Sequence, residues 1–166
     1  MNGELLPAGV SLRDAQPADR SFLVALYAGT RAAELSQAAW SDAQKRAFCA
    51  TQFDLQDRHY RQHYPGARFL VVELAAEPVG RLIEQVAGDE LRLMDIIVDP
   101  VHRRRGIGGA LVRMLCSRAD REGLGMRLFV ERHNPIRGFY ERLGFVVEAD
   151  ESIYMRMKRP PVTRAG

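Results

Sequence analysis

The stretch DPVHRRRGIGGALVRML, residues 99–115, sets a charged loop that contains glycines against the start of an amphipathic helix. Consecutive arginines at 103–105 precede Gly106, Gly108 and Gly109. A helix N-terminus presents unpaired N–H groups and a partial positive charge, and glycines let an anion reach the backbone without interference from Cβ atoms. This stretch therefore predicts a phosphate-binding loop, to which the arginines add full charges.

The helix that follows this loop is the clearest in the sequence. Apolar residues recur at the spacing of one buried helix face, namely Ile107, Ala110, Leu111, Met114 and Leu115, and Gly123 is suited to end the helix. Two familiar diphosphate loops do not fit. A dinucleotide-binding turn would need a third glycine where Leu111 stands and would begin directly after its strand, and a P-loop would end in Gly-Lys-Ser/Thr.

Composition limits the class of protein. The chain has 166 residues, 46% apolar and 27% charged, as expected for one globular domain spanning residues 1–166 with a tail at about 159–166 that we expect to be disordered. No apolar run approaches the roughly 20 residues of a membrane helix, and the first residues do not resemble a signal peptide, so we expect a cytosolic protein without membrane contact. The formal charge of +3 is too small to favour a nucleic-acid partner by itself. Cys49 and Cys116 are expected to be packing residues, and no metal site is predicted.

The first third of the sequence predicts a strand and two helices. Residues 9–13 alternate as in a short strand, and Pro17 is placed to begin a helix that ends near Leu35. Ser41 with Gln44 forms a capping-box pattern for a second helix that runs to about His63.

The remaining sequence alternates strands and helices. Three strand-like runs at 68–75, 78–86 and 90–98 are separated by turn signals at Glu77-Pro78 and Gly88-Asp89, which predicts an antiparallel meander. A strand at 126–131, a helix from Asn134 to Gly144 with Asn134 as its cap, and strands at 145–149 and 152–157 complete the chain. Strand, helix and strand in succession near the middle imply one parallel pair within an otherwise antiparallel sheet.

Two motifs resemble those of the GCN5-related N-acetyltransferases (GNAT). One is Arg103-x-x-Gly106-x-Gly108 after IIVDP, and the other is NPIRGFYERLGF at 134–145. The resemblance implies an α/β single-domain GNAT-like fold: a mixed, mostly antiparallel sheet with a splayed central parallel pair and helices on both faces. It also implies acetyl-CoA as co-substrate, with direct acetyl transfer to the amine of a small molecule or peptide.

The resemblance assigns roles to individual residues. It implies that the backbone of Ile96, Ile97 and Val98 holds the pantetheine arm, and that the loop binds the pyrophosphate through Arg103, Arg104, Arg105, Gly106, Ile107, Gly108 and Gly109. Asn134 is expected to hydrogen-bond the cofactor besides capping its helix. Tyr140 is expected to be the general acid for the departing thiolate, since a phenol remains protonated at neutral pH.

The general base is not identified by the family pattern, because Phe129 stands where several members carry a glutamate. Asp95, in the apolar strand LMDIIV, and Glu131, at the end of the next strand, are both candidates. An alternative hypothesis is a non-catalytic module that binds or senses acyl-CoA. A third, nucleic-acid binding through the basic loop and tail, predicts strong salt dependence. The acceptor is not identified, and the C-terminal strands could pair across a homodimer.

Overall fold

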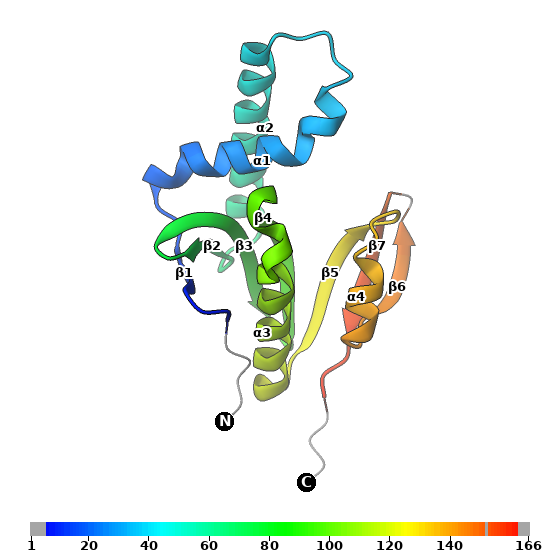
Figure 1. Ribbon diagram of the computed structural model, residues 1–166. Helices are drawn as coiled ribbons and strands as arrows, with labels where there is room; N and C mark the ends of the chain where they lie inside the picture. Colours follow the sequence, from blue (N-terminus) through cyan, green and yellow to red (C-terminus); the bar gives the residue numbers. More distant parts are fainter. Residues whose placement is uncertain (1–5, 152, 163–166) are drawn as a thin grey trace.

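The computed structural model describes residues 6–151 and 153–162, and its centre is a mixed sheet with the strand order β1-β2-β3-β4-β5-β7-β6 (Figure 1). The strands of this described sheet are β1 Val10–Asp14, β2 Arg68–Leu74, β3 Glu77–Ala87, β4 Glu90–Val98, β5 Gly125–Glu131, β6 Val146–Glu151 and β7 Tyr154–Arg159. The β4–β5 pair is parallel and the other described neighbours are antiparallel. The meander, the parallel pair and the order of elements predicted from the sequence are confirmed.

The helices begin and end close to the predicted residues. They are α1 Arg20–Leu35 after a 3-10 turn η1 at Pro17–Asp19, α2 Asp42–His63, α3 Ile107–Glu122 after a 3-10 turn η2 at Pro100–Arg105, and α4 Arg137–Arg142. The capping box of α2 is present: Ser41 Oγ accepts from the Gln44 N–H at 3.1 Å, and the Gln44 side chain accepts from the Ser41 N–H at 2.8 Å. Gly123, with φ of 70°, ends α3 in the left-handed conformation.

Helices pack on both faces of the sheet, as neighbouring residues of β3 show. Leu82 belongs to the core cluster that contains Ile107, Leu111 and Leu115 of α3. Arg81, the preceding residue, points to the opposite face, where its guanidinium lies 5.5 Å from the Phe53 ring of α2. The sheet is therefore buried between α3 on one side and α1 with α2 on the other (Figure 1).

The turn between β2 and β3 differs from the prediction. Ala75 and Ala76 make it, with positive φ values of 50° and 66°, whereas Glu77 and Pro78 already belong to β3. Pro78 is accommodated because it pairs with Glu73 at an irregularity of the ladder. Alanine seldom adopts positive φ, so Ala75 and Ala76 gave no turn signal in the sequence. The turn was therefore predicted at Glu77-Pro78, where proline is typical of turns.

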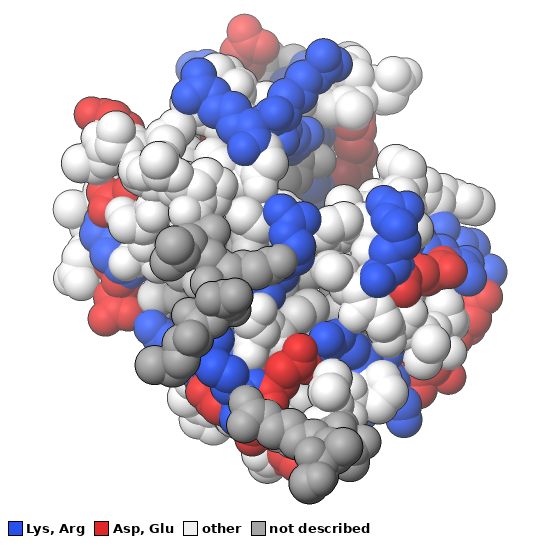
Figure 2. Space-filling view, turned by 60° about the horizontal axis from the view of Figure 1, so that its bottom comes forward, with Lys and Arg blue, Asp and Glu red and all other residues white. Residues whose placement is uncertain are grey.

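The predicted disordered tail is wrong at its beginning. Arg159 is the last residue of β7, and its guanidinium donates to the Leu143 carbonyl at 2.7 Å and to Asp120 at 2.7 Å. The rest of that prediction extends to residues 163–166, which lie outside the described residues. Within the described part of the chain, no helix is long and apolar enough to span a bilayer. On the face shown in Figure 2, basic and acidic side chains are interspersed among neutral ones.

Candidate active site

The parallel pair β4–β5 comes apart halfway along its length. The two strands are in register from Glu90–Gly125 to Leu93–Leu128, and their described residues do not pair beyond that point. On the other side of β4, Ile83 pairs with Asp95 and Glu84 with Leu93, so Met94 is an extra residue in the ladder. A bulge of this kind bends its strand and increases the local twist. It lies where β4 diverges from β5.

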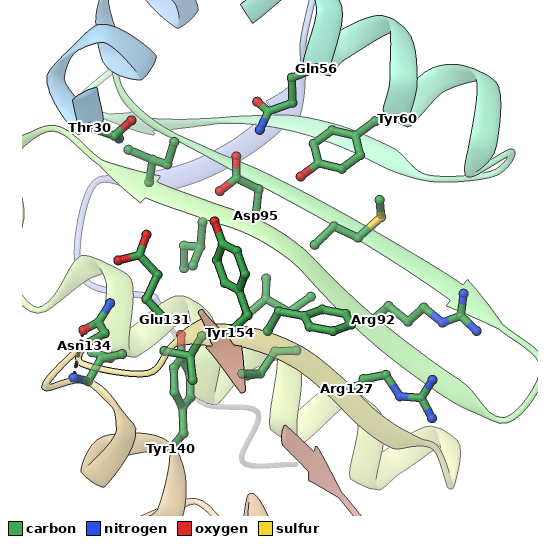
Figure 3. Close-up of a pocket in the computed structure, with 18 of the residues that line it drawn as sticks. Thr30, Gln56, Tyr60, Arg92, Asp95, Arg127, Glu131, Asn134, Tyr140 and Tyr154 are labelled. Atoms are coloured by element: carbon green, nitrogen blue, oxygen red, sulfur yellow. Dashed lines mark hydrogen bonds between the residues drawn. The ribbon is translucent and has the colours of Figure 1, made fainter. Parts of the chain in front are cut away.

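A cavity of about 800 Å³ opens between the diverging strands (Figure 3). Its lining comes from α1, α2, β4, β5, β7 and the segment that leads into α4: Tyr27, Thr30, Gln56, Tyr60, Tyr64, Arg92, Leu93, Met94, Asp95, Ile96, Ile97, Arg127, Leu128, Phe129, Val130, Glu131, Asn134, Ile136, Tyr140 and Tyr154. Of the predicted site residues, Asp95, Ile96, Ile97, Glu131, Asn134 and Tyr140 thus line one cavity. Val98 and the loop 103–109 lie outside its lining.

Asp95 is the carboxylate set deepest in this cavity, with 21% of its side chain exposed. Burial raises its pKa, while Arg81, whose Nη2 lies 3.0 Å from Asp95 Oδ2, opposes that rise. In Figure 3 the hydroxyl groups of Tyr60 and Tyr154 point toward Asp95. A partly buried carboxylate with a raised pKa and polar neighbours is a suitable proton acceptor.

Tyr140 faces the cavity from the side of α4. Its ring packs against Phe139 and Phe145 at centroid distances of 5.8 and 5.6 Å, and 7% of the residue is exposed. The hydroxyl points into the cavity in Figure 3. Burial raises the pKa of this phenol, so it carries its proton through the neutral and mildly alkaline range.

Asn134 does not cap α4 as predicted, because the helix begins at Arg137 with Ile136 as its N-cap residue. Asn134 Oδ1 instead accepts from the Ile136 N–H at 3.0 Å, which closes a turn ahead of the helix. Pro135 lies in this turn, so the Asn-Pro signal marked the turn and not the first helical residue. Asn134 and Glu131 stand together at the Tyr140 end of the cavity (Figure 3).

The arginine and glycine loop lies beyond the end of β4. Asp99 Oδ1 accepts from the Val101 N–H at 3.1 Å, and Arg103 Nε donates to the Val98 carbonyl at 3.1 Å, so the loop is fixed to the strand. Gly106 has φ of 72° and begins α3 in the left-handed conformation. Arg104 and Arg105 are exposed. A helix start leaves its first N–H groups unpaired, so the beginning of α3 beside the exposed Arg104 and Arg105 is a suitable seat for an anion.

Residues 65–147 match the family described as Acetyltransferase (GNAT) domain. The chain belongs to this family. The GNAT match covers β2 to the start of β6, which includes the divergent strands, the loop and Tyr140. As the sequence motifs indicated, the protein is an acyltransferase by family. None of the curated proteins matches the sequence.

Solved structures show the same GNAT fold. The PaiA N-acetyltransferase from Thermoplasma acidophilum, in complex with coenzyme A, is 17% identical with a TM-score of 0.67, and the alignment covers 91% of this chain and 98% of that one. Ard1 from Thermoplasma volcanium is 24% identical with a TM-score of 0.59, covering 94% and 100%. The ribosomal-protein-S18-alanine N-acetyltransferase from Escherichia coli is 20% identical with a TM-score of 0.62, covering 94% and 96%.

Several lining residues of this GNAT domain were not singled out from the sequence. Gln56 and Tyr64 reach the cavity from α2 and its C-cap, Tyr154 reaches it from β7, and Arg81 stands behind Asp95. Their positions depend on which helix face meets the sheet, which no short motif encodes. Arg81 carried a signal, since an arginine within the apolar run PVGRLIEQV requires a buried partner.

Two histidines of α2 form a pair that was not identified from the sequence. His59 and His63 are one helical turn apart, the spacing of many metal-binding pairs, and their rings stack at 4.3 Å. His63 Nδ1 lies 3.1 Å from the His59 carbonyl oxygen. Among the described residues no group of three or more potential metal ligands comes together.

Proposed function

We propose that the protein is an acetyl-CoA-dependent N-acetyltransferase that moves the acetyl group directly to a primary amine. The observation that carries this proposal is the divergence of β4 and β5 into a cavity that holds Asp95 on one wall and Tyr140 on the other. A direct transfer requires one group to accept a proton from the amine and another to give one to the thiolate. These two side chains supply both.

The proposed binding mode follows the loop and the free edge of β4. Coenzyme A places its diphosphate against the N–H groups that open α3, with Arg104 and Arg105 nearby. Beyond Leu93, Ile96 and Ile97 have no register partner on the described β5, so this edge of β4 is available to bond the pantetheine arm. Asn134 lines the same passage and adds a side-chain amide. Positioning of the two reactants would supply much of the rate.

The proposed reaction has one bond-making and one bond-breaking event. The amine nitrogen attacks the thioester carbonyl, the C–S bond breaks, and Tyr140 donates its proton to the leaving thiolate. Asp95 accepts the proton that the amine loses, either directly or through a water molecule. No covalent intermediate on the protein is needed. Glu131 remains the competing candidate for the base.

The test is thiol release from acetyl-CoA in the presence of a panel of primary amines. Release that depends on the amine, with formation of the acetylated product, supports the proposal. Tight binding of acetyl-CoA without turnover on any acceptor would favour the acyl-CoA-binding module instead. A cytosolic location, a single domain over 1–166 and a homodimer stay predictions.

A further inference from the structure

Two arginines stand side by side at one end of the cavity. Arg92 of β4 and Arg127 of β5 are register partners in the parallel pair, one residue before its last paired position. Both side chains line the cavity, and Figure 3 shows them at the same end, on the side away from Asn134. They therefore mark the closed end of the divergence, opposite the end where coenzyme A would enter.

The ion pairs around these arginines leave an excess of positive charge. Glu90 bonds Arg92 at 2.9 Å and Arg127 at 3.2 Å. Glu148 lies 3.7 Å from Arg127 Nε and is shared with Arg156 at 3.0 Å and Lys158 at 3.9 Å. Glu90 is thus shared by Arg92 and Arg127, and Glu148 is divided among Arg127, Arg156 and Lys158, so the carboxylates beside Arg92 and Arg127 only partly offset the charge of these two arginines. The Nε of Arg127 is buried and has no hydrogen-bond partner in the described structure.

The guanidinium groups are accessible enough to meet a ligand, because 37% of the Arg92 side chain and 30% of the Arg127 side chain are exposed. They are also partly desolvated, and a charge-assisted hydrogen bond is stronger in such surroundings than in water. Paired guanidinium groups suit a planar or tetrahedral anion. An anion at this position would balance the excess charge.

The part of the cavity around Asp95 carries acidic and hydroxyl groups instead of arginines. Asp95 and Glu131 provide carboxylates there, and Tyr60 and Tyr154 provide hydroxyl groups (Figure 3). Asp95 lies three residues beyond Arg92 on the same strand, a span of roughly 10 Å at about 3.3 Å per residue. One acceptor molecule could therefore contact both regions only if its amine and its anionic group were several bonds apart.

We infer that the acceptor is an amine that also carries an anionic group, such as a carboxylate, separated from the amine by several bonds and held by Arg92 and Arg127. This inference rests on the proposed function and adds the class of acceptor to it. Arg92 and Arg127 then determine specificity and take no part in proton transfer. Free α-amino acids without a second anionic group are predicted to be poor acceptors, because their amine and carboxylate are attached to the same carbon atom.

The experiment compares two acceptors of the same length, 6-aminohexanoate and its neutral amide, 6-aminohexanamide. We expect kcat/KM for the acid to exceed that for the amide by at least ~10-fold, mainly through KM, because the neutral amide cannot make a charge-assisted contact with both guanidinium groups. In Arg92→Gln/Arg127→Gln the ratio falls toward one. The double lysine variant, R92K/R127K, keeps the charge and retains part of the preference. Arg121→Gln, an exposed arginine of α3, is the control and leaves the ratio unchanged.

Binding of the same two probes, measured by titration calorimetry with and without coenzyme A, separates the two proposals. Preferential binding of the acid without acetyl transfer contradicts the proposed function and supports the inferred anion site. Acetyl transfer to both probes at equal kcat/KM overturns the inference alone. Equal binding of both probes, or a preference that survives in R92Q/R127Q, also overturns it. Circular dichroism and thermal unfolding confirm that the double variants fold.

Discussion

Arg81 Nη2 lies 3.0 Å from Asp95 Oδ2, and the same nitrogen donates to Gln56 Oε1 at 3.2 Å. Only 5% of the Arg81 side chain is exposed, so this contact joins β3, β4 and α2 in the interior. The pair holds the Asp95 carboxylate at the cavity wall. It also offsets the burial that would otherwise keep this carboxyl group protonated.

The pH dependence of the reaction should report the Asp95 carboxyl group. A general base works only when deprotonated, and burial raises the pKa of Asp95, so we predict that kcat/KM falls with decreasing pH at a value above the ordinary range of an aspartate. Asp95→Asn should lower kcat by about 10²-fold or more and remove this limb of the profile. The measurement needs an acceptor amine that is already unprotonated over the range studied.

Glu131→Gln is the matched control for this prediction. Glu131 also lines the cavity, but it lies at the exposed end of β5. We expect its substitution to leave the acidic limb in place. If Glu131→Gln removed the limb and Asp95→Asn did not, Glu131 would be the base.

Tyr140→Phe isolates the phenolic hydroxyl from the packing of the ring. Phenylalanine keeps the contacts with Phe139 and Phe145, so the free energy of unfolding should change by less than about 1 kcal/mol. Loss of the proton donor should lower kcat by roughly 10²-fold with little change in the binding of acetyl-CoA. Rapid-mixing measurement of thiol release checks this. An unchanged kcat would mean that the thiolate leaves without help from Tyr140.

Gly80 tests whether the backbone of β4 must keep its position. A Cβ atom at Gly80 would lie 2.5 Å from the Ile97 carbonyl oxygen. Because this oxygen belongs to the backbone, a change of side-chain rotamer cannot relieve the clash. Gly80→Ala should therefore shift β4, destabilise the protein by about 1–3 kcal/mol and raise KM for acetyl-CoA. Gly29→Ala in α1 is the control, because no atom lies within 4 Å of its added Cβ. Equal KM values for acetyl-CoA in the two variants would show that the backbone around Ile97 does not bind the cofactor.

Most of the fold could be predicted because its signals are local. The capping box at Ser41, the apolar face of α3 and the left-handed Gly123 each act within one or two helical turns, and each was placed correctly. The errors arose where a local signal had two physical outcomes. Asn134 before Pro135 is compatible with a helix cap or with a separate turn, and the structure has the turn.

The candidate site could be predicted only in part, because several of its side chains are positioned by contacts between residues distant in sequence. Tyr140 was a candidate from the resemblance and Asp95 from its place in an apolar strand, yet the Arg81–Asp95 pair exists because β3 and β4 are neighbours and β4 carries a bulge at Met94. The pairing of Arg92 with Arg127 likewise requires the register of the parallel strands. Thirty-four residues, α3 among them, lie between these two arginines in the chain. No periodic pattern in the sequence connects positions so far apart.

Acid stability should depend on the Arg13–Asp19 pair. Arg13 donates two hydrogen bonds of 2.8 Å to Asp19, and the Gln16 N–H donates a third at 2.7 Å, which lowers the pKa of Asp19 to about 2. Because the pKa of Asp19 in the folded protein lies below the 3.8 of an ordinary aspartate, the stabilisation is complete above pH 3.8 and is lost as the pH falls through about 2. Arg13→Ala should cost roughly 1–2 kcal/mol at pH 7 and less at acid pH, since the pair is partly screened by solvent.

Urea unfolding at a series of pH values measures this loss. Arg20→Ala serves as the control, because the Arg20–Asp54 pair is about half exposed on both sides and should contribute little. A stability difference for Arg13→Ala that did not vary with pH would show that Asp19 makes no electrostatic contribution.

The diphosphate site proposed at the start of α3 can be tested by comparing coenzyme A with a part of it that lacks the diphosphate. Arg103 bonds the Val98 carbonyl, so its substitution would disturb β4 as well as the ligand. Arg104 and Arg105 are exposed and offer a cleaner test. Arg104→Glu/Arg105→Glu should raise the Kd of coenzyme A by at least ~10-fold, an effect that added salt should diminish because exposed charges are screened. Pantetheine, which lacks the diphosphate, should bind both proteins equally in titration calorimetry. Arg121→Glu, with one charge reversal where the test variant has two, is the control for a general charge effect away from the loop. An equal loss of pantetheine and coenzyme A affinity would locate the diphosphate elsewhere.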